Sequence, residues 1–219
     1  MTSIPHRDVH SEANLWPRSA RTVPIMLYDE FLAAEELSGL LNYCLRNASR
    51  FGQSEVKRYD GEAELDNEYR RSRVLFDLGP YRFLFQQRLL TLLPHLLLAL
   101  TKRPFIVREL EIQLTSSNHG EFFRPHTDNG DDELQAREIT FVYYFHREPR
   151  RFAGGELRIF DTVHADGVPI ETERFQVIYP LQNQIVVFPS CYLHEILPVI
   201  CPSREFADSR FTVNGWYRR

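Results

Sequence analysis

Cysteine is scarce in this chain, and the few residues present exclude two common uses of it. The 219 residues include only Cys44, Cys191 and Cys201, which lie at wide and irregular spacing. Three such residues supply neither an even disulfide framework nor the paired C-x-x-C spacing of a zinc site. A reducing compartment therefore suits the chain best. A reactive thiol at Cys191 is a minor alternative, because most lone cysteines are small buried apolar residues.

Surplus positive charge and long apolar runs are lacking as well. Asp and Glu number 30 against 26 Lys and Arg, a formal net charge of −4, and no long basic block indicates nucleic-acid binding. The longest apolar run, residues 89–100, is shorter than a membrane span and contains Pro94 and His95. Residues 1–10 lack the apolar segment of an export signal. We therefore expect a cytoplasmic protein that binds neither nucleic acid nor a membrane. Its oligomeric state stays open.

The composition that is present indicates a single globular domain. Hydrophobic residues make up 43% of the chain and charged residues 26%, and a chain of this length can bury a sizeable core. Residues 1–24 contain three prolines and little periodicity, which predicts an N-terminal extension. Residues 25–219 are then expected to form one domain. Its first part, residues 25–103, reads as helical support, and residues 104–219 read as a β-rich core.

The hydrophobic pattern predicts two helices followed by many short strands. Helices are expected over residues 33–48 and 81–101, the second kinked or split at Pro94, with a strand at residues 73–78 between them. After residue 103 the predicted strands are residues 105–115, 139–145, 156–160, 174–178, 184–188, 194–200 and 210–217. This order favours an α+β, β-rich fold, an antiparallel sandwich or barrel with helices packed outside.

An H-x-D motif in the β-rich part is the first candidate for chemistry. His126 and Asp128 are two residues apart in an extended segment, so their side chains can point to the same side of a strand. His194, at the start of another predicted strand, can supply a third ligand. Two histidines and one carboxylate leave half of an octahedron open, which suits a ferrous ion that must bind a cosubstrate and dioxygen together.

Other interpretations of these residues stay open. The same H-x-D pattern occurs at His6 and Asp8, where no strand or β-rich context supports a metal role. Asp128 could instead bond backbone amides in the turn before Gly130. The acidic run around Asp128 could also suggest calcium, although it lacks the alternating spacing of a calcium-binding loop.

Several blocks after this motif carry a family resemblance. H-T-D-N-G is followed by R-E-I-T-F-V-Y-Y-F at residues 137–145 and by G-G-E-L-R-I-F at residues 154–160. V-V-F-P-S-x-x-L-H-E-I-x-P-V at residues 186–199 and R-F-T-V-N-G-W-Y at residues 210–217 come next. The segment from about residue 104 to 219 thus resembles the catalytic domain of the Fe(II)- and 2-oxoglutarate-dependent dioxygenases, in the prolyl-hydroxylase branch. The resemblance implies a double-stranded β-helix (jelly-roll) core with supporting N-terminal helices.

The resemblance also implies a ligand set and its cofactors. His126, Asp128 and His194 would hold Fe(II), and 2-oxoglutarate would chelate the metal as cosubstrate together with O2, with ascorbate as a stimulant. These three residues are also the catalytic candidates.

The far carboxylate of 2-oxoglutarate needs a cation, and two criteria disagree about which one. The family's spacing after the distal histidine selects Arg204, whereas the context of the last strand selects Arg210. We favour Arg210, because residues 202–209 are polar and turn-like and read as an insertion before that strand. Tyr144 matches the family position whose phenol donates to the same carboxylate. The period of a strand lets only one of Tyr143 and Tyr144 face the pocket.

The implied activity is hydroxylation of an unactivated C–H bond by a 2-oxoglutarate-dependent dioxygenase, most simply of a prolyl residue in a peptide or protein. One alternative keeps this chemistry but takes a free amino acid or another small molecule. A non-catalytic β-barrel binding module is a third, less favoured hypothesis. The sequence does not name the substrate, and the polar stretch at residues 51–73 is where loops that contact it are expected.

Overall fold

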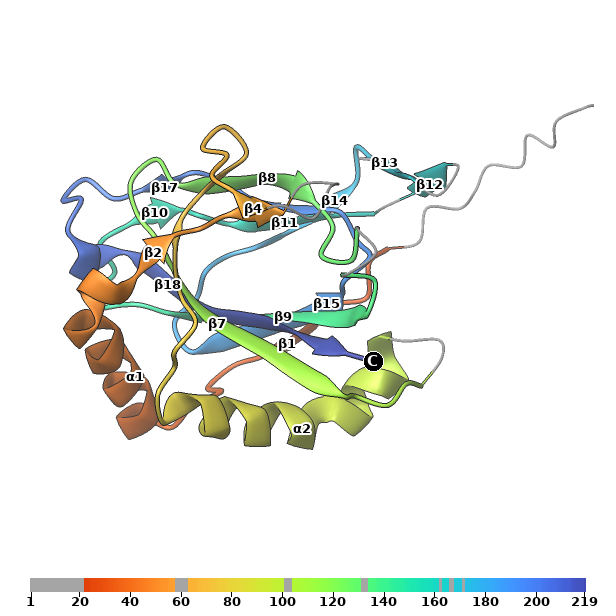
Figure 1. Cartoon of the computed structure of the whole chain (residues 1–219), viewed down its shortest axis with the longest axis horizontal. Coiled ribbons are helices and arrows are strands. Elements are labelled where there is room, and N and C mark those ends of the chain that lie inside the picture. Colours follow the sequence, from red (N-terminus) through yellow and green to blue (C-terminus); the bar gives the residue numbers. More distant parts are fainter. Residues whose placement is uncertain are drawn as a thin grey trace, which may run out of the picture.

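Two facing antiparallel β-sheets form the body of the protein (Figure 1). The computed structural model describes residues 22–57, 63–100, 104–130, 134–161, 163–165, 168–170 and 172–219. The larger sheet contains, in spatial order, β1 (Met26–Tyr28), β15 (Gln184–Pro189), β9 (Arg137–Phe145), β18 (Arg210–Arg218), β7 (Glu109–Ser117), β6 (Arg73–Leu75) and β2 (Gly52–Gln53).

The smaller sheet lies opposite and carries the segment with the H-x-D motif. Its strands, in spatial order, are β14 (Phe175–Ile178), β11 (Leu157–Phe160), β16 (His194–Ile196), β8 (Phe122–His126) and β5 (Arg70–Arg71). Three two-stranded antiparallel sheets complete the described strands: β10 (Ala153–Gly154) with β17 (Val199–Ile200), β12 (Val163–Ala165) with β13 (Val168–Ile170), and β3 (Val56–Lys57) with β4 (Ala63–Glu64).

Helices α1 (Ala34–Arg46) and α2 (Tyr81–Leu100) cover the outer face of the larger sheet (Figure 1). Two short 3-10 turns, Ala48–Arg50 and Phe206–Asp208, complete the helical elements. Leu40 of α1 and Phe85 of α2 are fully buried and share one core cluster with Tyr143 of β9. The predicted arrangement of helices packed outside a β-core is therefore confirmed.

The central strand β9 shows why this sequence forms a strand buried on both faces. Its side chains alternate between the layer under the helices and the layer between the sheets. Tyr143 belongs to the helix-side cluster, whereas Val142 and Tyr144 belong to a second cluster with Leu157 and Ile159 of the smaller sheet. Nearly every residue of β9 is buried, so the strand reads as a continuous apolar run.

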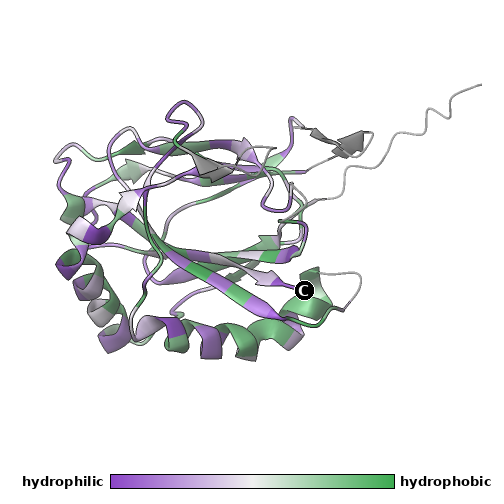
Figure 2. Ribbon diagram, in the orientation of Figure 1, coloured by the Kyte–Doolittle hydropathy of each residue, from purple (hydrophilic) through white to green (hydrophobic). Residues whose placement is uncertain are grey.

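Helix α2 differs from its prediction in one respect. Pro94 lies inside a single 20-residue helix and does not split it. The apolar run at residues 89–100 lies inside this longer helix, which is long and apolar enough to cross a membrane by length and composition alone. One such helix is weak evidence, because core helices pass the same test. Figure 2 shows apolar colour along α2, where Leu89 is fully buried but Leu98 is 87% exposed.

Other differences concern element boundaries. The segment predicted at residues 105–115 forms a strand only from Glu109, and the strand predicted at residues 73–78 ends at Leu75. The strand predicted at residues 194–200 is divided into β16 and β17. Val23, within the range assigned to the N-terminal extension, is buried and donates its backbone N–H to Asp161 at 2.9 Å.

Candidate active site

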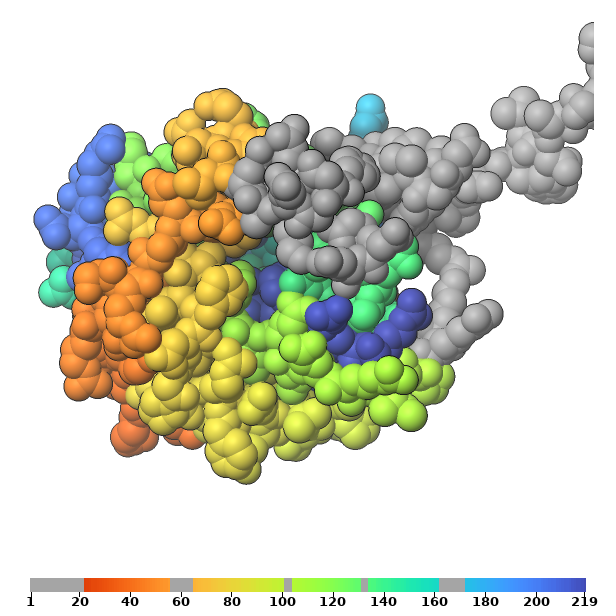
Figure 3. Space-filling view, viewed as in Figure 1, coloured from red at the N-terminus to blue at the C-terminus, as the bar shows by residue number. Residues whose placement is uncertain are grey.

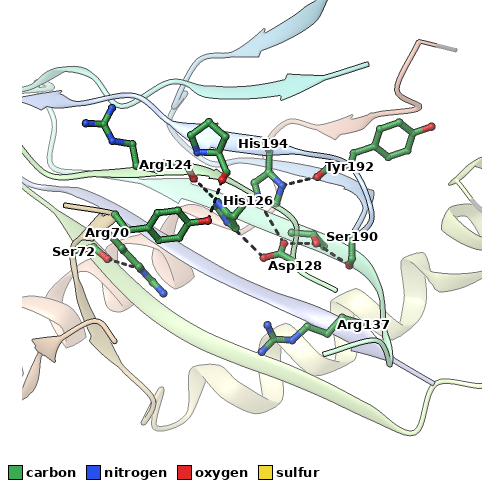
Figure 4. A network of polar contacts seen from close by, with 12 residues as sticks. Arg70, Ser72, Arg124, His126, Asp128, Arg137, Ser190, Tyr192 and His194 are labelled. Atoms are coloured by element: carbon green, nitrogen blue, oxygen red, sulfur yellow. Dashed lines mark hydrogen bonds and ion pairs between the residues drawn. The ribbon is translucent and has the colours of Figure 1, made fainter. Parts of the chain in front are cut away.

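Three predicted ligand residues converge between the two sheets (Figure 4). His126 ends β8, His194 begins β16, and the two are direct partners in the strand pairing. Their ring centroids are 4.2 Å apart. The Nε2 atoms of His194 and His126 lie 3.4 Å and 3.8 Å from the carboxylate oxygens of Asp128. One donor atom from each residue falls within 4.8 Å of the others, which is close enough for a single ion.

The position of Asp128 corrects the reasoning from strand period. Strand β8 ends at His126, and Asp128 lies in the turn that follows. Its backbone N–H donates to the carbonyl of Ser190 at 3.1 Å, which ties this turn to the end of β15 in the larger sheet. The side chains of His126 and Asp128 therefore converge because this contact joins the two sheets. Alternation of side chains along one strand does not bring them together.

Each histidine is oriented by a backbone carbonyl two residues before it. The Nδ1 atom of His126 lies 2.8 Å from the carbonyl oxygen of Arg124, and Nδ1 of His194 lies 2.9 Å from that of Tyr192. A carbonyl only accepts hydrogen bonds, so Nδ1 carries the proton in both rings. The lone pair of Nε2 is then free to bind a metal on the side of Asp128.

The carboxylate of Asp128 accepts a hydrogen bond from one hydroxyl group, which in turn contacts a second hydroxyl group. Thr140 of β9 donates its hydroxyl to Oδ2 of Asp128 at 2.7 Å, and the Ser190 hydroxyl lies 2.9 Å from that of Thr140. The sequence does signal Thr140, because it shares the inward face of β9 with Val142 and Tyr144. Ser190, by contrast, carries no such periodic signal.

The electrostatics favour the protonation states that a metal needs. Burial lowers the pKa of His126 to about 3, and the neighbouring His194 acts in the same direction. Burial by itself raises the pKa of Asp128, but the two histidines and the Thr140 hydrogen bond outweigh it, so this pKa lies below its ordinary value. A neutral imidazole beside a carboxylate is the form in which these side chains bind metal ions.

The structure also places Arg210 and Tyr144 beside each other and leaves their polar atoms unused. Arg210 is only 3% exposed, and its Nε and Nη2 atoms have no hydrogen-bond partner. The Tyr144 hydroxyl is likewise buried without a partner, and the Arg210 guanidinium carbon lies 5.0 Å from the centre of its ring. Burial lowers the pKa of Arg210 and raises that of Tyr144 to about 12. This pair of donors fits a carboxylate.

Tyr143 and Arg204, the alternatives to Tyr144 and Arg210, lie away from the cavity. Tyr143 points to the helix side and donates to Asn183 at 2.9 Å. Arg204 is exposed in the turn before β18, with a positive φ of 57°, and it does not line the cavity. Gly155 packs directly against Arg210, since a Cβ there would lie 2.6 Å from the Arg210 Cδ. This glycine, predicted only as part of a turn, leaves the space that the arginine occupies.

One cavity of about 620 Å³, including its open mouth, joins these groups. Its lining includes His126, Asp128, His194, Arg210, Trp216 and Arg70. Figure 3 shows a hollow on this face of the molecule, with dark blue atoms of β18 at its floor. Arg70 was not singled out from the sequence.

The remaining sequence hypotheses concern residues that are not described or that do not line this cavity. His6, Asp8 and the acidic residues at 131–133 lie outside the described residues. Cys191 is half-buried and does not line the cavity, and burial raises the pKa of its thiol. A raised pKa disfavours the thiolate that a reactive cysteine requires.

Comparison with known proteins shows which families this chain resembles. Residues 112–218 match the family model of the 2OG-Fe(II) oxygenase superfamily. An uncharacterized PKHD-type hydroxylase of Synechocystis sp. is 46% identical over 155 residues, which is 70% of this chain. The chain spans about half (51%) of the length of that curated relative.

Solved structures support the same fold. A prolyl-4-hydroxylase of Pseudomonas putida superposes with a TM-score of 0.61 at 24% identity, covering 90% of this chain and 94% of that one. A prolyl hydroxylase of Trichoplax adhaerens, solved with a peptide fragment of a hypoxia inducible factor, gives a TM-score of 0.64 at 16% identity and covers 90% and 84%. These superpositions concern the fold, and the likeness to the 2OG-Fe(II) oxygenase superfamily rests on the match of residues 112–218 to its family model. The expected jelly-roll fold and the likeness to prolyl hydroxylases are confirmed.

Proposed function

We propose that this protein is an Fe(II)- and 2-oxoglutarate-dependent dioxygenase that hydroxylates an unactivated C–H bond of a prolyl residue in a peptide or protein. One observation carries the proposal: a cluster of two histidines and a carboxylate shares a cavity with the buried Arg210, whose Nε and Nη2 have no hydrogen-bond partner among the described residues. The donor set suits Fe(II), because it covers one face of an octahedron and leaves the other open.

His126, Asp128 and His194 would hold the metal, and Arg210 with Tyr144 would bind the far carboxylate of 2-oxoglutarate. When bound, iron and 2-oxoglutarate would supply an oxidation by O2, in which one oxygen atom of O2 ends in succinate as the cosubstrate loses carbon dioxide and the other enters the substrate C–H bond. The chain's own contribution is positional. It fixes the imidazoles through backbone carbonyls and Asp128 through Thr140, and the buried surroundings of Arg210 exclude water from the carboxylate pair.

Two considerations support a proline in an extended chain as substrate. One of the similar structures was solved with a peptide fragment bound. Proline is also a physically suitable target, because its ring already fixes φ and little conformational entropy is lost when it binds across an open cavity. Arg70 of β5 and Phe122 and Phe123 of β8 line the cavity here.

The metal and cosubstrate parts of the proposal can be tested without a substrate. Anaerobic protein should bind one equivalent of Fe(II), and 2-oxoglutarate should then produce the weak visible charge-transfer band of such chelates. His126→Ala should abolish both signals. A normal band in that variant would remove His126 from the site.

The substrate class needs a second experiment. Enzyme, Fe(II), 2-oxoglutarate and ascorbate are incubated separately with proline-containing peptides and with free amino acids, and substrate-dependent succinate is measured together with products heavier by one oxygen atom. We expect hydroxylated proline in the peptides, absent with Asp128→Ala protein. Turnover of free amino acids alone would refute the peptide assignment and establish the small-molecule alternative.

A further inference from the structure

Arg70 is a cation in the cavity that the proposed chemistry leaves unused. It begins β5 at the edge of the smaller sheet and lines the same cavity as the three metal ligands. Its Nε donates to the Ser72 hydroxyl at 3.2 Å, and its guanidinium carbon lies 4.7 Å from the centre of the Phe123 ring. Phe123 in turn stacks on His126 with ring centroids 3.5 Å apart. The guanidinium is thus separated from a metal ligand by one aromatic ring.

Arg70 forms no ion pair among the residues that the structure describes. Its neighbours do: Arg71 pairs with Glu68 at 3.2 Å, and Arg137 pairs with Glu111. Burial lowers the pKa of Arg70 to about 10, against the opposing effect of Asp128, so the side chain is still charged at neutral pH. A partly desolvated charge without a counterion is unfavourable unless a ligand completes the pair.

The balance of charge in the loaded site shows what kind of ligand is missing. Apart from the two histidines, only Asp128, Arg210 and Arg70 are ionisable among the described residues that line the cavity. The positive charges of Fe(II) and Arg210 together equal the negative charges of Asp128 and of the two carboxylates of 2-oxoglutarate. Arg70 then remains as one uncompensated positive charge at the place left for the substrate.

We propose that the substrate carries a carboxylate close to the carbon that is hydroxylated, and that this carboxylate pairs with Arg70. The inference rests on the proposed function and narrows its substrate class. Stacking on Phe123 and the bond to Ser72 hold the guanidinium plane in place, which suits recognition of a carboxylate through two hydrogen bonds. The group can come from the free end of a chain or amino acid, or from an acidic residue next to the target proline.

Two matched pairs of probes distinguish these sources. N-acetyl-L-proline is compared with N-acetyl-L-prolinamide, and acetyl-Asp-Pro-amide with acetyl-Asn-Pro-amide. Binding is measured by calorimetry to protein loaded with 2-oxoglutarate and Mn(II), which replaces Fe(II) so that no turnover occurs. We expect the acidic member of at least one pair to bind at least about tenfold more tightly than its neutral partner.

The variants then assign the preference to one side chain. Arg70→Gln should reduce the difference between acidic and neutral probes to within about threefold, whereas Arg70→Lys should keep its sign. Arg71→Gln is the matched control. It also removes one positive charge, at the next position in the sequence, but the Arg71 side chain does not line the cavity. This control should keep the full preference.

The proposal is overturned if neither acidic probe binds better than its neutral partner, if no probe binds at millimolar concentration, or if the preference survives Arg70→Gln. It is also overturned if Arg70→Gln weakens 2-oxoglutarate binding as strongly as Arg210→Ala, since Arg70 would then serve the cosubstrate. Failure of the proposed function is a separate result: wild-type protein would not form the chelate band with Fe(II) and 2-oxoglutarate.

Discussion

Replacing Thr140 by valine removes one hydroxyl group behind a metal ligand and changes little else. Valine keeps the branched shape of threonine, so the packing of β9 should be preserved. The lost contact is a buried hydrogen bond of 2.7 Å to Oδ2 of Asp128. Bonds of this kind to charged groups contribute about 1.5–3 kcal/mol, which is roughly a 10- to 150-fold change in an equilibrium constant.

Because the bond holds the carboxylate in place, we expect most of this free energy to appear in metal affinity. Loss of partners behind metal ligands typically weakens affinity by about 10- to 100-fold, in agreement with the estimate from the hydrogen bond. Fe(II) or Co(II) is titrated anaerobically into the variant, and the metal-independent melting temperature is measured alongside. Thr140→Ser is the matched control, since it keeps the hydroxyl and should stay close to wild type.

A metal affinity of Thr140→Val within about threefold of wild type would refute this reasoning. So would an equal loss in Thr140→Ser, because the effect would then come from packing. Ser190→Ala should have a smaller effect than Thr140→Val, as Ser190 contacts the Thr140 hydroxyl and reaches the Asp128 carboxylate only through it.

Three further predictions concern the cosubstrate and the metal. Arg210→Ala should raise the KM for 2-oxoglutarate by roughly thirtyfold to several thousandfold in initial-rate assays, because one partner of a buried ion pair is lost. Arg204→Ala should raise this KM far less. The reverse order would refute our choice of Arg210. Gly155→Ala should also raise the KM for 2-oxoglutarate, because the added Cβ would meet the Arg210 side chain. Gly120→Ala is the control: Gly120 has a similar positive φ but open space around it, so this variant should change stability alone. Equal KM values for the two variants would exclude the steric role of Gly155. Metal at about a hundred times its Kd should raise the melting temperature by roughly 5–10 °C, a shift that a chelator reverses, and an unchanged melting temperature would count against binding to the folded state.

Local patterns were sufficient to predict the helices and strands whose apolar residues recur at a regular spacing. The leucines of α1 recur at helical spacing, and the long apolar strand β9 is recognisable without any partner. The alternation of side chains along a strand also predicted that Tyr143 and Tyr144 lie on opposite faces of β9. The structure places them in different core clusters, as expected for a property of the strand itself. Pro94 shows the limit of such reasoning. Its effect on α2 depends on packing against the core, and there the helix continues through it.

Contacts between distant segments could not be predicted in this way. Asp128 reaches the metal cluster because its backbone bonds Ser190, more than sixty positions away in the sequence. That Arg70 forms no ion pair within the described part of the chain is likewise visible only once its neighbours are known to pair with Glu68 and Glu111. Sequence blocks indicated which residue types take part, and the three-dimensional arrangement decided which of them meet.

The Thr140–Asp128 bond joins two layers as well as orienting a ligand. Thr140, Tyr144 and Arg210 belong to the larger sheet, while the two histidines belong to the smaller one. A metal ion on the histidines and Asp128, with a cosubstrate reaching Arg210, would therefore cross-link the sandwich from the inside. Loading the site should stiffen the whole body. Amide hydrogen exchange in β8 and β16 should slow when both are bound, and opening of the sheets in the empty protein would dismantle the site before the strands themselves unfold.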